Sequence, residues 1–116
     1  MSLESFFNPK SIAVVGVSGD STKLGAVVFN NIIDAGYEGK LYGVNPKLDG
    51  QEVYGKPCYG SVDKLPEPMD LVVILVPARF TEPVIDACVT NGTHIISLGH
   101  PSAPAPNILY PVSNLD

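Results

Sequence analysis

A chain of 116 residues that is 45% apolar can bury one hydrophobic core and has room for one domain only. Its formal net charge of −5, with seven Lys and Arg residues, argues against the basic face that nucleic acids and anionic membranes require, so any phosphate site must be built locally. No run approaches 18 apolar residues, and Cys58 and Cys88 lack metal-ligand spacing. We expect a soluble, cytoplasmic protein with ordinary thiols, although the sequence leaves a disulfide open.

The first predicted element is a strand over residues 11–17, almost entirely apolar, as in a strand covered on both faces. A polar loop with glycines at 16, 19 and 25 follows, and helical spacing then predicts a helix over 24–35. The loop meets the G-x-G-x-x-G fingerprint only loosely, but its N–H groups and the helix N-terminus favour an anion. The alternative is that these glycines only form a strand-to-helix turn. The expected apolar face of the helix is Leu24, Val27, Val28, Ile32 and Ile33.

A second strand is predicted over 40–45 and ends at Pro46, because proline cannot donate to the ladder. The turn-rich segment 48–57 is expected to be a connector. A short extended piece at 58–62 follows it, and then a single helical turn before Pro66.

The strongest strand signal covers residues 71–76 and predicts an interior strand. A helix is predicted over 82–90, capped by Thr81 and ended by Asn91 and Gly92, and a last strand over 93–98. This alternation predicts an α/β fold: a single Rossmann-like, doubly wound, mostly parallel sheet.

Three loops follow the carboxyl ends of the predicted strands and should converge on one site at the switch point of the sheet. They cover residues 16–19, 44–47 and 76–79. A domain that binds NAD has Asp or Glu at the end of its second strand, whereas this chain has Asn45-Pro46-Lys47. A lysine there favours an extra phosphate near the ribose, as in NADP or coenzyme A (CoA), unless Lys47 is simply a solvated loop charge.

The ordered motifs Ser11-Ile-Ala-Val-Val-Gly-Val-Ser18, Gly43-Val-Asn-Pro-Lys47 and Asp70-Leu-Val-Val-Ile-Leu-Val-Pro77 resemble one known family. It is the CoA-binding domain of NDP-forming acyl-CoA synthetases, which include ADP-forming acetate–CoA ligases; succinyl-CoA synthetase α subunits are more distant relatives. Phe6-Phe-Asn-Pro-Lys10 is also similar to the family's sequence before the first strand. The resemblance covers residues 5–98.

The resemblance implies that CoA is the bound cofactor and assigns residues to its parts. Those implied to line the phosphates are Gly16, Ser18, Gly19, Lys23, Leu24 and Gly25. Those implied to flank the adenosine and its 3′-phosphate are Val44, Pro46 and Lys47. Val76 and Pro77 are implied to border the pantetheine arm, with Arg79 nearby.

The family's phosphohistidine and ATP-grasp nucleotide sites are implied to lie in further domains or a partner subunit, since neither His94 nor His100 matches the phosphohistidine motif. This chain is then a CoA-binding module without a catalytic residue, in an enzyme that converts acyl-CoA, NDP and phosphate to acid, CoA and NTP. A noncatalytic CoA-sensing domain, free-standing or fused to an acetyltransferase, is one alternative. An NADP-binding oxidoreductase fragment is another.

The segment after Leu98 departs from the family. Prolines at 101, 104, 106 and 111 are incompatible with the helix that the family has there. We therefore divide the chain into a CoA-binding domain, 1–98, and a proline-rich irregular or extended tail, 99–116, left by truncation or an altered reading frame.

Overall fold

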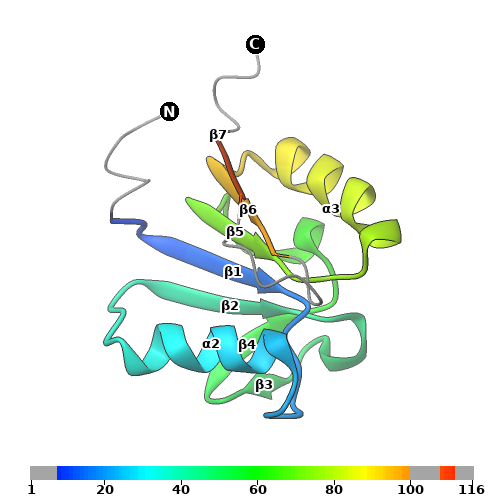
Figure 1. The fold of residues 1–116 in the computed structure, drawn as a ribbon. Helices are drawn as coiled ribbons and strands as arrows, with labels where there is room; N and C mark the ends of the chain where they lie inside the picture. The colour runs from blue at the N-terminus through cyan, green and yellow to red at the C-terminus, as the bar shows by residue number, and fades with distance from the viewer. Residues whose placement is uncertain (1–7, 100–107, 112–116) are drawn as a thin grey trace.

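The computed structural model describes residues 8–99 and 108–111. Within them, seven strands form one sheet (Figure 1) in the order β3-β4-β2-β1-β5-β6-β7. Its five parallel strands are β4 (Lys56–Tyr59), β2 (Lys40–Val44), β1 (Ser11–Val15), β5 (Leu71–Ile74) and β6 (Ile95–Leu98). The antiparallel edge strands are β3 (Glu52–Val53) on β4 and β7 (Ile108–Pro111) on β6. The predicted Rossmann-like, mostly parallel sheet is confirmed.

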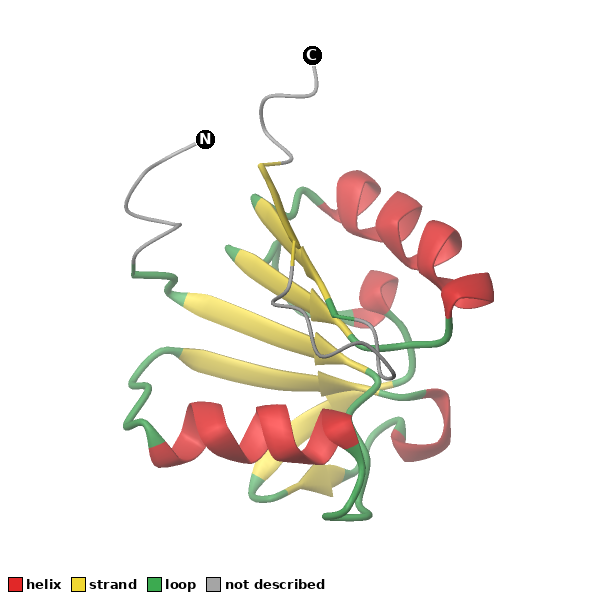
Figure 2. Ribbon diagram, viewed as in Figure 1, coloured by secondary structure: helices red, strands yellow, loops and turns green. Residues whose placement is uncertain are grey.

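Two helices cover opposite faces of this sheet (Figure 2). Helix α2 (Leu24–Asp34) connects β1 to β2, and α3 (Ala78–Asn91) connects β5 to β6. Alternate residues of β1 separate the two cores: Ile12 packs in the core under α2, whereas Ala13 packs in the core under α3. The strand order reverses between β1 and β5, so a ligand site is expected outside their carboxyl ends.

Helix α2 has nearly the predicted bounds, but its predicted apolar face is wrong at two positions. Leu24 and Val27 are 38% and 42% exposed, whereas Phe29 is fully buried in the core with Ile12. Phe29 is the largest apolar side chain of the helix, and its burial sets the rotation of α2. The small residues at 25 and 26 also face inward.

Helix α3 begins a turn earlier than predicted, and Thr81 does not cap it. Pro77 is the N-cap residue in an extended conformation, with φ −53° and ψ 148°. Pro83 therefore lies inside the helix instead of near its first turn, where its missing N–H leaves out one backbone bond. The predicted end is confirmed, because Gly92 terminates α3 with φ +90°.

Within the described residues, the proposed tail contributes one strand to the sheet. Residues 108–111 are extended, as β7, and pair with the open edge of β6. The ladder stabilises an extended backbone even though this segment ends in a proline. Residues 100–107 and 112–116, and the predicted contact of Phe6 and Phe7 with the core, lie outside the described residues. Neither described helix is long and apolar enough to cross a membrane.

Candidate functional site

The three predicted loops begin at the same edge of the sheet. Val15 at the end of β1 is in register with Val44 on one side and with Ile74 on the other. Backbone bonds continue past the strands: Gly16 N–H donates to the Val44 carbonyl at 3.0 Å, and Leu75 N–H donates to the Val15 carbonyl at 2.8 Å. The loops after β1, β2 and β5 therefore leave the sheet side by side.

Two glycines make the β1–α2 connection, residues 16–23, sterically possible; we call it the phosphate loop. Gly16 has φ +101°, and a Cβ there would lie 2.9 Å from the Leu75 carbonyl carbon. A Cβ on Gly25 would lie 2.8 Å from the Gly16 carbonyl carbon. Gly19 differs, because a Cβ there would meet nothing within 4 Å. Glycines 16 and 25 bring the start of α2 against the loop, and Gly19 lies beside open space.

The N-terminus of α2 is suited to an anion. Its N-cap residue, Lys23, is extended and makes no capping side-chain bond, and the first turn contains no acidic residue. The positive end of the helix dipole therefore remains uncompensated there. The nearby Asp20 carboxylate accepts bonds from the Thr22 hydroxyl at 2.7 Å and the Thr22 N–H at 3.0 Å, which lower the pKa of Asp20. The Asp20 carboxylate therefore helps to order the loop through its two bonds with Thr22.

Asn45 joins the loop after β2 to the phosphate loop. Its side-chain Oδ1 accepts a bond from Lys47 N–H at 2.8 Å and begins a short 3-10 helix, η1 (Pro46–Leu48). Its Nδ2 donates to the Val17 carbonyl at 2.8 Å. From the sequence, Asn45 could be recognised only as part of a motif, because the 28-residue separation between Asn45 and Val17 carries no local signal.

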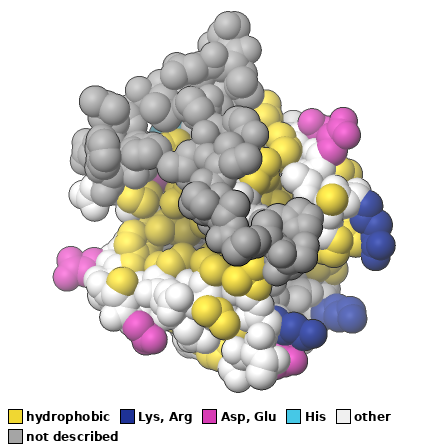
Figure 3. All heavy atoms as spheres, viewed as in Figure 1, with side chains coloured by type: hydrophobic (Ala, Val, Ile, Leu, Met, Phe, Trp, Pro, Cys, Tyr) yellow, Lys and Arg dark blue, Asp and Glu magenta, His cyan; other side chains and the backbone are white. Residues whose placement is uncertain are grey.

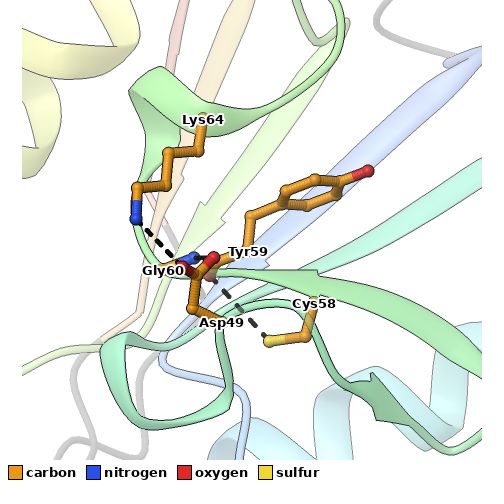
Figure 4. Close-up of polar contacts among 5 residues, drawn as sticks. All are labelled: Asp49, Cys58, Tyr59, Gly60 and Lys64. Carbon is orange, nitrogen blue, oxygen red and sulfur yellow. Dashed lines mark hydrogen bonds and ion pairs between the residues drawn. The ribbon is translucent and has the colours of Figure 1, made fainter.

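Asp49, the residue that ends η1, links this short helix to Gly60 and Lys64 (Figure 4); we call these contacts the Asp49 bracket. The Asp49 carboxylate accepts a bond from Gly60 N–H at 2.7 Å and pairs with the Lys64 ammonium at 2.9 Å. Both interactions lower the pKa of Asp49, with the Lys64 bond the larger cause. A Cβ on Gly60 would lie 3.0 Å from Asp49 Cγ, so this close approach favours glycine. The sequence carries no local signal for this contact, because Asp49 and Gly60 are 11 residues apart.

An apolar pocket of about 420 Å³ opens between these strand ends and α3. Its lining residues are Val15, Val44, Pro46, Gly60, Ser61, Val62, Val76, Phe80, Pro83, Val84 and Ala87. Three predicted site residues, at 44, 46 and 76, are therefore brought together. Pro77 and Arg79 are not part of the lining; Arg79 instead lies over the Phe80 ring, 4.8 Å from its centre. Phe80 was missed because residues 78–81 were not expected to be helical.

Two lysines near these loops are available to a ligand. Lys40 and Lys64 form ion pairs with Glu67 and Asp49, whereas the exposed Lys23 and Lys47 join no ion pair within the described residues. On the face shown in Figure 3, Lys and Arg side chains gather on the right, the side toward which β1 and β2 run in Figure 1. Lys23 and Lys47 are therefore positive charges of these loops that remain able to pair with an anionic ligand.

His94 lies elsewhere. It precedes β6 at the amino edge of the sheet, and its Nδ1 lies 3.1 Å from the Asp70 carboxylate. No group of three or more His, Cys, Asp or Glu residues that could hold a metal ion occurs in the described parts of the chain. The features at the carboxyl edge of this Rossmann-like sheet are suited to a ligand with phosphates and an apolar part.

Comparison with known proteins identifies the family. The model of the CoA binding domain family matches residues 7–98, so the chain belongs to this family and coenzyme A is its cofactor. The resemblance predicted from the sequence is confirmed. The open space beside Gly19, the two available lysines and the apolar pocket fit such a ligand.

Three similar proteins differ in how much of their length this chain covers. The chain is 42% identical over 100 residues to the α subunit of ADP-forming acetate–CoA ligase I from Pyrococcus furiosus, covering 84% of this chain and 22% of the relative. A dinucleotide-forming acetyl-coenzyme A synthetase 1 from Ca. Korarchaeum cryptofilum has a TM-score of 0.74 at 41% identity, over 79% of this chain and 20% of that chain. A conserved hypothetical protein from P. furiosus has a TM-score of 0.70 at 30% identity, over 81% of this chain and 78% of that chain. The chain thus spans about a fifth of the length of the two enzymes.

Proposed function

We propose that this chain is the CoA-binding module of an NDP-forming acyl-CoA synthetase, which interconverts acyl-CoA, NDP and phosphate with acid, CoA and NTP. The observation that carries the proposal is the apolar pocket, which is lined both by Pro46, next to Lys47, and by Val15, the residue before the phosphate loop. The identity to a ligase α subunit supports the reaction class. The phosphohistidine and nucleotide sites would lie in further domains or a partner subunit. Two free, buried cysteines fit a cytoplasmic location.

In this proposal each part of the site holds one part of the cofactor. N–H groups of the phosphate loop and of the α2 N-terminus, together with Lys23, would bind the diphosphate. Lys47 would pair with the 3′-phosphate as a point charge. Pro46 and Val76 would supply apolar contacts from the pocket wall. Bound CoA supplies the thiol that carries the acyl group, and the role of this chain is to hold and orient it.

Calorimetric titration with CoA, dephospho-CoA, NADP and NAD tests the proposal. We expect CoA to bind more tightly than dephospho-CoA, by up to about fivefold for an exposed ion pair. Lys47→Ala should abolish that difference, whereas Lys56→Ala, at the start of β4 between β3 and β2, should leave it unchanged. Tighter binding of NADP than of CoA, or no binding of any of the four, would overturn the assignment of a complete CoA site to this chain.

A second candidate is a noncatalytic CoA-sensing domain. It is favoured by the hypothetical protein from P. furiosus, because this chain covers 78% of that small protein. An assay of NTP formation by the full-length parent protein distinguishes the two candidate functions. Formation of NTP from NDP and phosphate that requires acyl-CoA supports the synthetase, whereas CoA binding without such turnover supports sensing.

A further inference from the structure

Tyr54 has a strained backbone close to the phosphate loop. It lies in the tight turn between β3 and β4 and has φ +52°, followed by Gly55 with φ +79°. Tyr54 is the only non-glycine residue with a positive φ among the described residues. A bulky side chain in this region costs on the order of 1 kcal/mol, and such strain is concentrated at functional sites. The conformation therefore calls for a compensating interaction.

The side chain of Tyr54 provides that interaction. Its hydroxyl donates to the Ser18 carbonyl at 3.1 Å, and its ring lies 6.3 Å from the Phe29 ring. The preceding carbonyl of the loop, on Val17, accepts the Asn45 amide at 2.8 Å. Two consecutive carbonyls of the phosphate loop are therefore held by side chains from two other loops.

Holding a carbonyl also sets the direction of the next N–H. A trans peptide unit is planar, and its N–H points opposite to its C=O. The Ser18 N–H is thus directed away from Asn45, and the Gly19 N–H away from Tyr54. Nothing lies within 4 Å of a Cβ built on Gly19, so this peptide unit borders open space. Donors fixed beside an uncapped helix N-terminus are suited to a diphosphate.

We propose that Tyr54 is a positioning residue that, together with Asn45, fixes the peptide units of the phosphate loop for the CoA diphosphate. The proposal rests on the proposed function and deepens it. Without the Tyr54 hydroxyl, the Ser18–Gly19 peptide can rotate, and the ligand must then order it on binding.

The test is calorimetric titration of Tyr54→Phe, which keeps the ring and removes the hydroxyl. We expect its affinity to fall about 3- to 10-fold for CoA and equally for dephospho-CoA, as for one lost hydrogen bond. The CoA to dephospho-CoA ratio should stay as in the wild type, whereas Lys47→Ala should change that ratio. Tyr42→Phe, which removes a hydroxyl from β2 on the other face of the sheet, is the matched control and should bind as the wild type does.

A second variant separates positioning from stability. Tyr54→Gly removes the strain and the side chain together, so it should weaken binding at least as much as Tyr54→Phe without a matching loss in melting temperature. Wild-type affinity in Tyr54→Phe, or a loss for CoA alone, would overturn the role of Tyr54. A wild type that binds neither ligand would overturn the proposed function itself, and this role with it.

Discussion

Replacing Gly25 with alanine tests whether the first turn of α2 must lie directly against the phosphate loop. In an ordinary helix, Gly→Ala is stabilising by up to about 1 kcal/mol, because alanine has the higher helix propensity. Gly25 is buried at the start of α2, and a Cβ there would lie 2.8 Å from the Gly16 carbonyl carbon and 3.1 Å from Val17 Cα. Both neighbours are backbone atoms, so no side-chain rotation relieves the overlap.

The overlap is relieved only if the backbone of α2 or of the phosphate loop moves. Overpacking typically costs about 1–3 kcal/mol, and backbone on two sides places Gly25 at or beyond the upper end of that range. After the gain in helix propensity, we expect a net destabilisation of about 2 kcal/mol. For a domain of this size, that corresponds to a fall in melting temperature of about 10 °C.

Thermal unfolding followed by circular dichroism measures this effect. Gly19→Ala is the matched control in the same loop, and it should change stability by less than about 0.5 kcal/mol because a Cβ there meets nothing within 4 Å. If the Gly25→Ala variant is as stable as the wild type, or more stable, the result would refute the close contact between α2 and the phosphate loop.

Three further predictions concern the pocket, the Asp49 bracket and the thiols. Phe80→Ala should weaken CoA binding by about 1 kcal/mol in calorimetry, as for about 40 Å² of apolar surface, and barely change the melting temperature, since Phe80 is 49% exposed yet lines the pocket; equal affinity would count against the pocket. The pKa of Asp49 is lowered in the fold, so its carboxylate should stabilise the protein above its ordinary value of 3.8 and lose that effect as the pH falls below it. The melting temperatures of wild type and Asp49→Asn should therefore differ near neutral pH and converge below pH 3.8, and a difference that persists in acid would refute the reasoning. Burial raises the pKa of Cys88 to about 11 and also raises that of Cys58, so a disulfide reagent at about pH 8 should react with neither thiol until the protein is unfolded; rapid reaction of the native protein would contradict their burial.

The parallel strands and the loops after them could be predicted because their signals are local. The apolar run at β1 and the proline after β2 each mark a strand end within a few residues. Parallel pairing then places all these ends at one edge, so the convergence of the loops follows from the topology. The residues at the end of β2 left the ligand open between NADP and CoA, and the resemblance of the ordered motifs to a known family then predicted CoA.

The interactions that shape the loops could not be predicted in the same way. The hydroxyl of Tyr54 reaches the phosphate loop across 36 residues, and Asp49 binds Gly60 across 11. Such contacts depend on the twist and register of β3 and β4, and β3 has only two residues. The rotation of α2 likewise depends on how tightly Phe29 packs, which the apolar pattern alone does not decide.

The role of Asn45 explains how the end of β2 can serve a different ligand from the one that NAD domains bind there. In those domains an acidic residue at this position accepts bonds from the ribose. An amide can donate and accept at once, and Asn45 uses both abilities, donating to the Val17 carbonyl and accepting from Lys47 N–H. A carboxylate could not make the first bond and would repel a phosphate. With Asn45 engaged in the scaffold, Lys47 is the charged residue of this loop, and in the proposed CoA site its sign suits the 3′-phosphate that distinguishes CoA from dephospho-CoA.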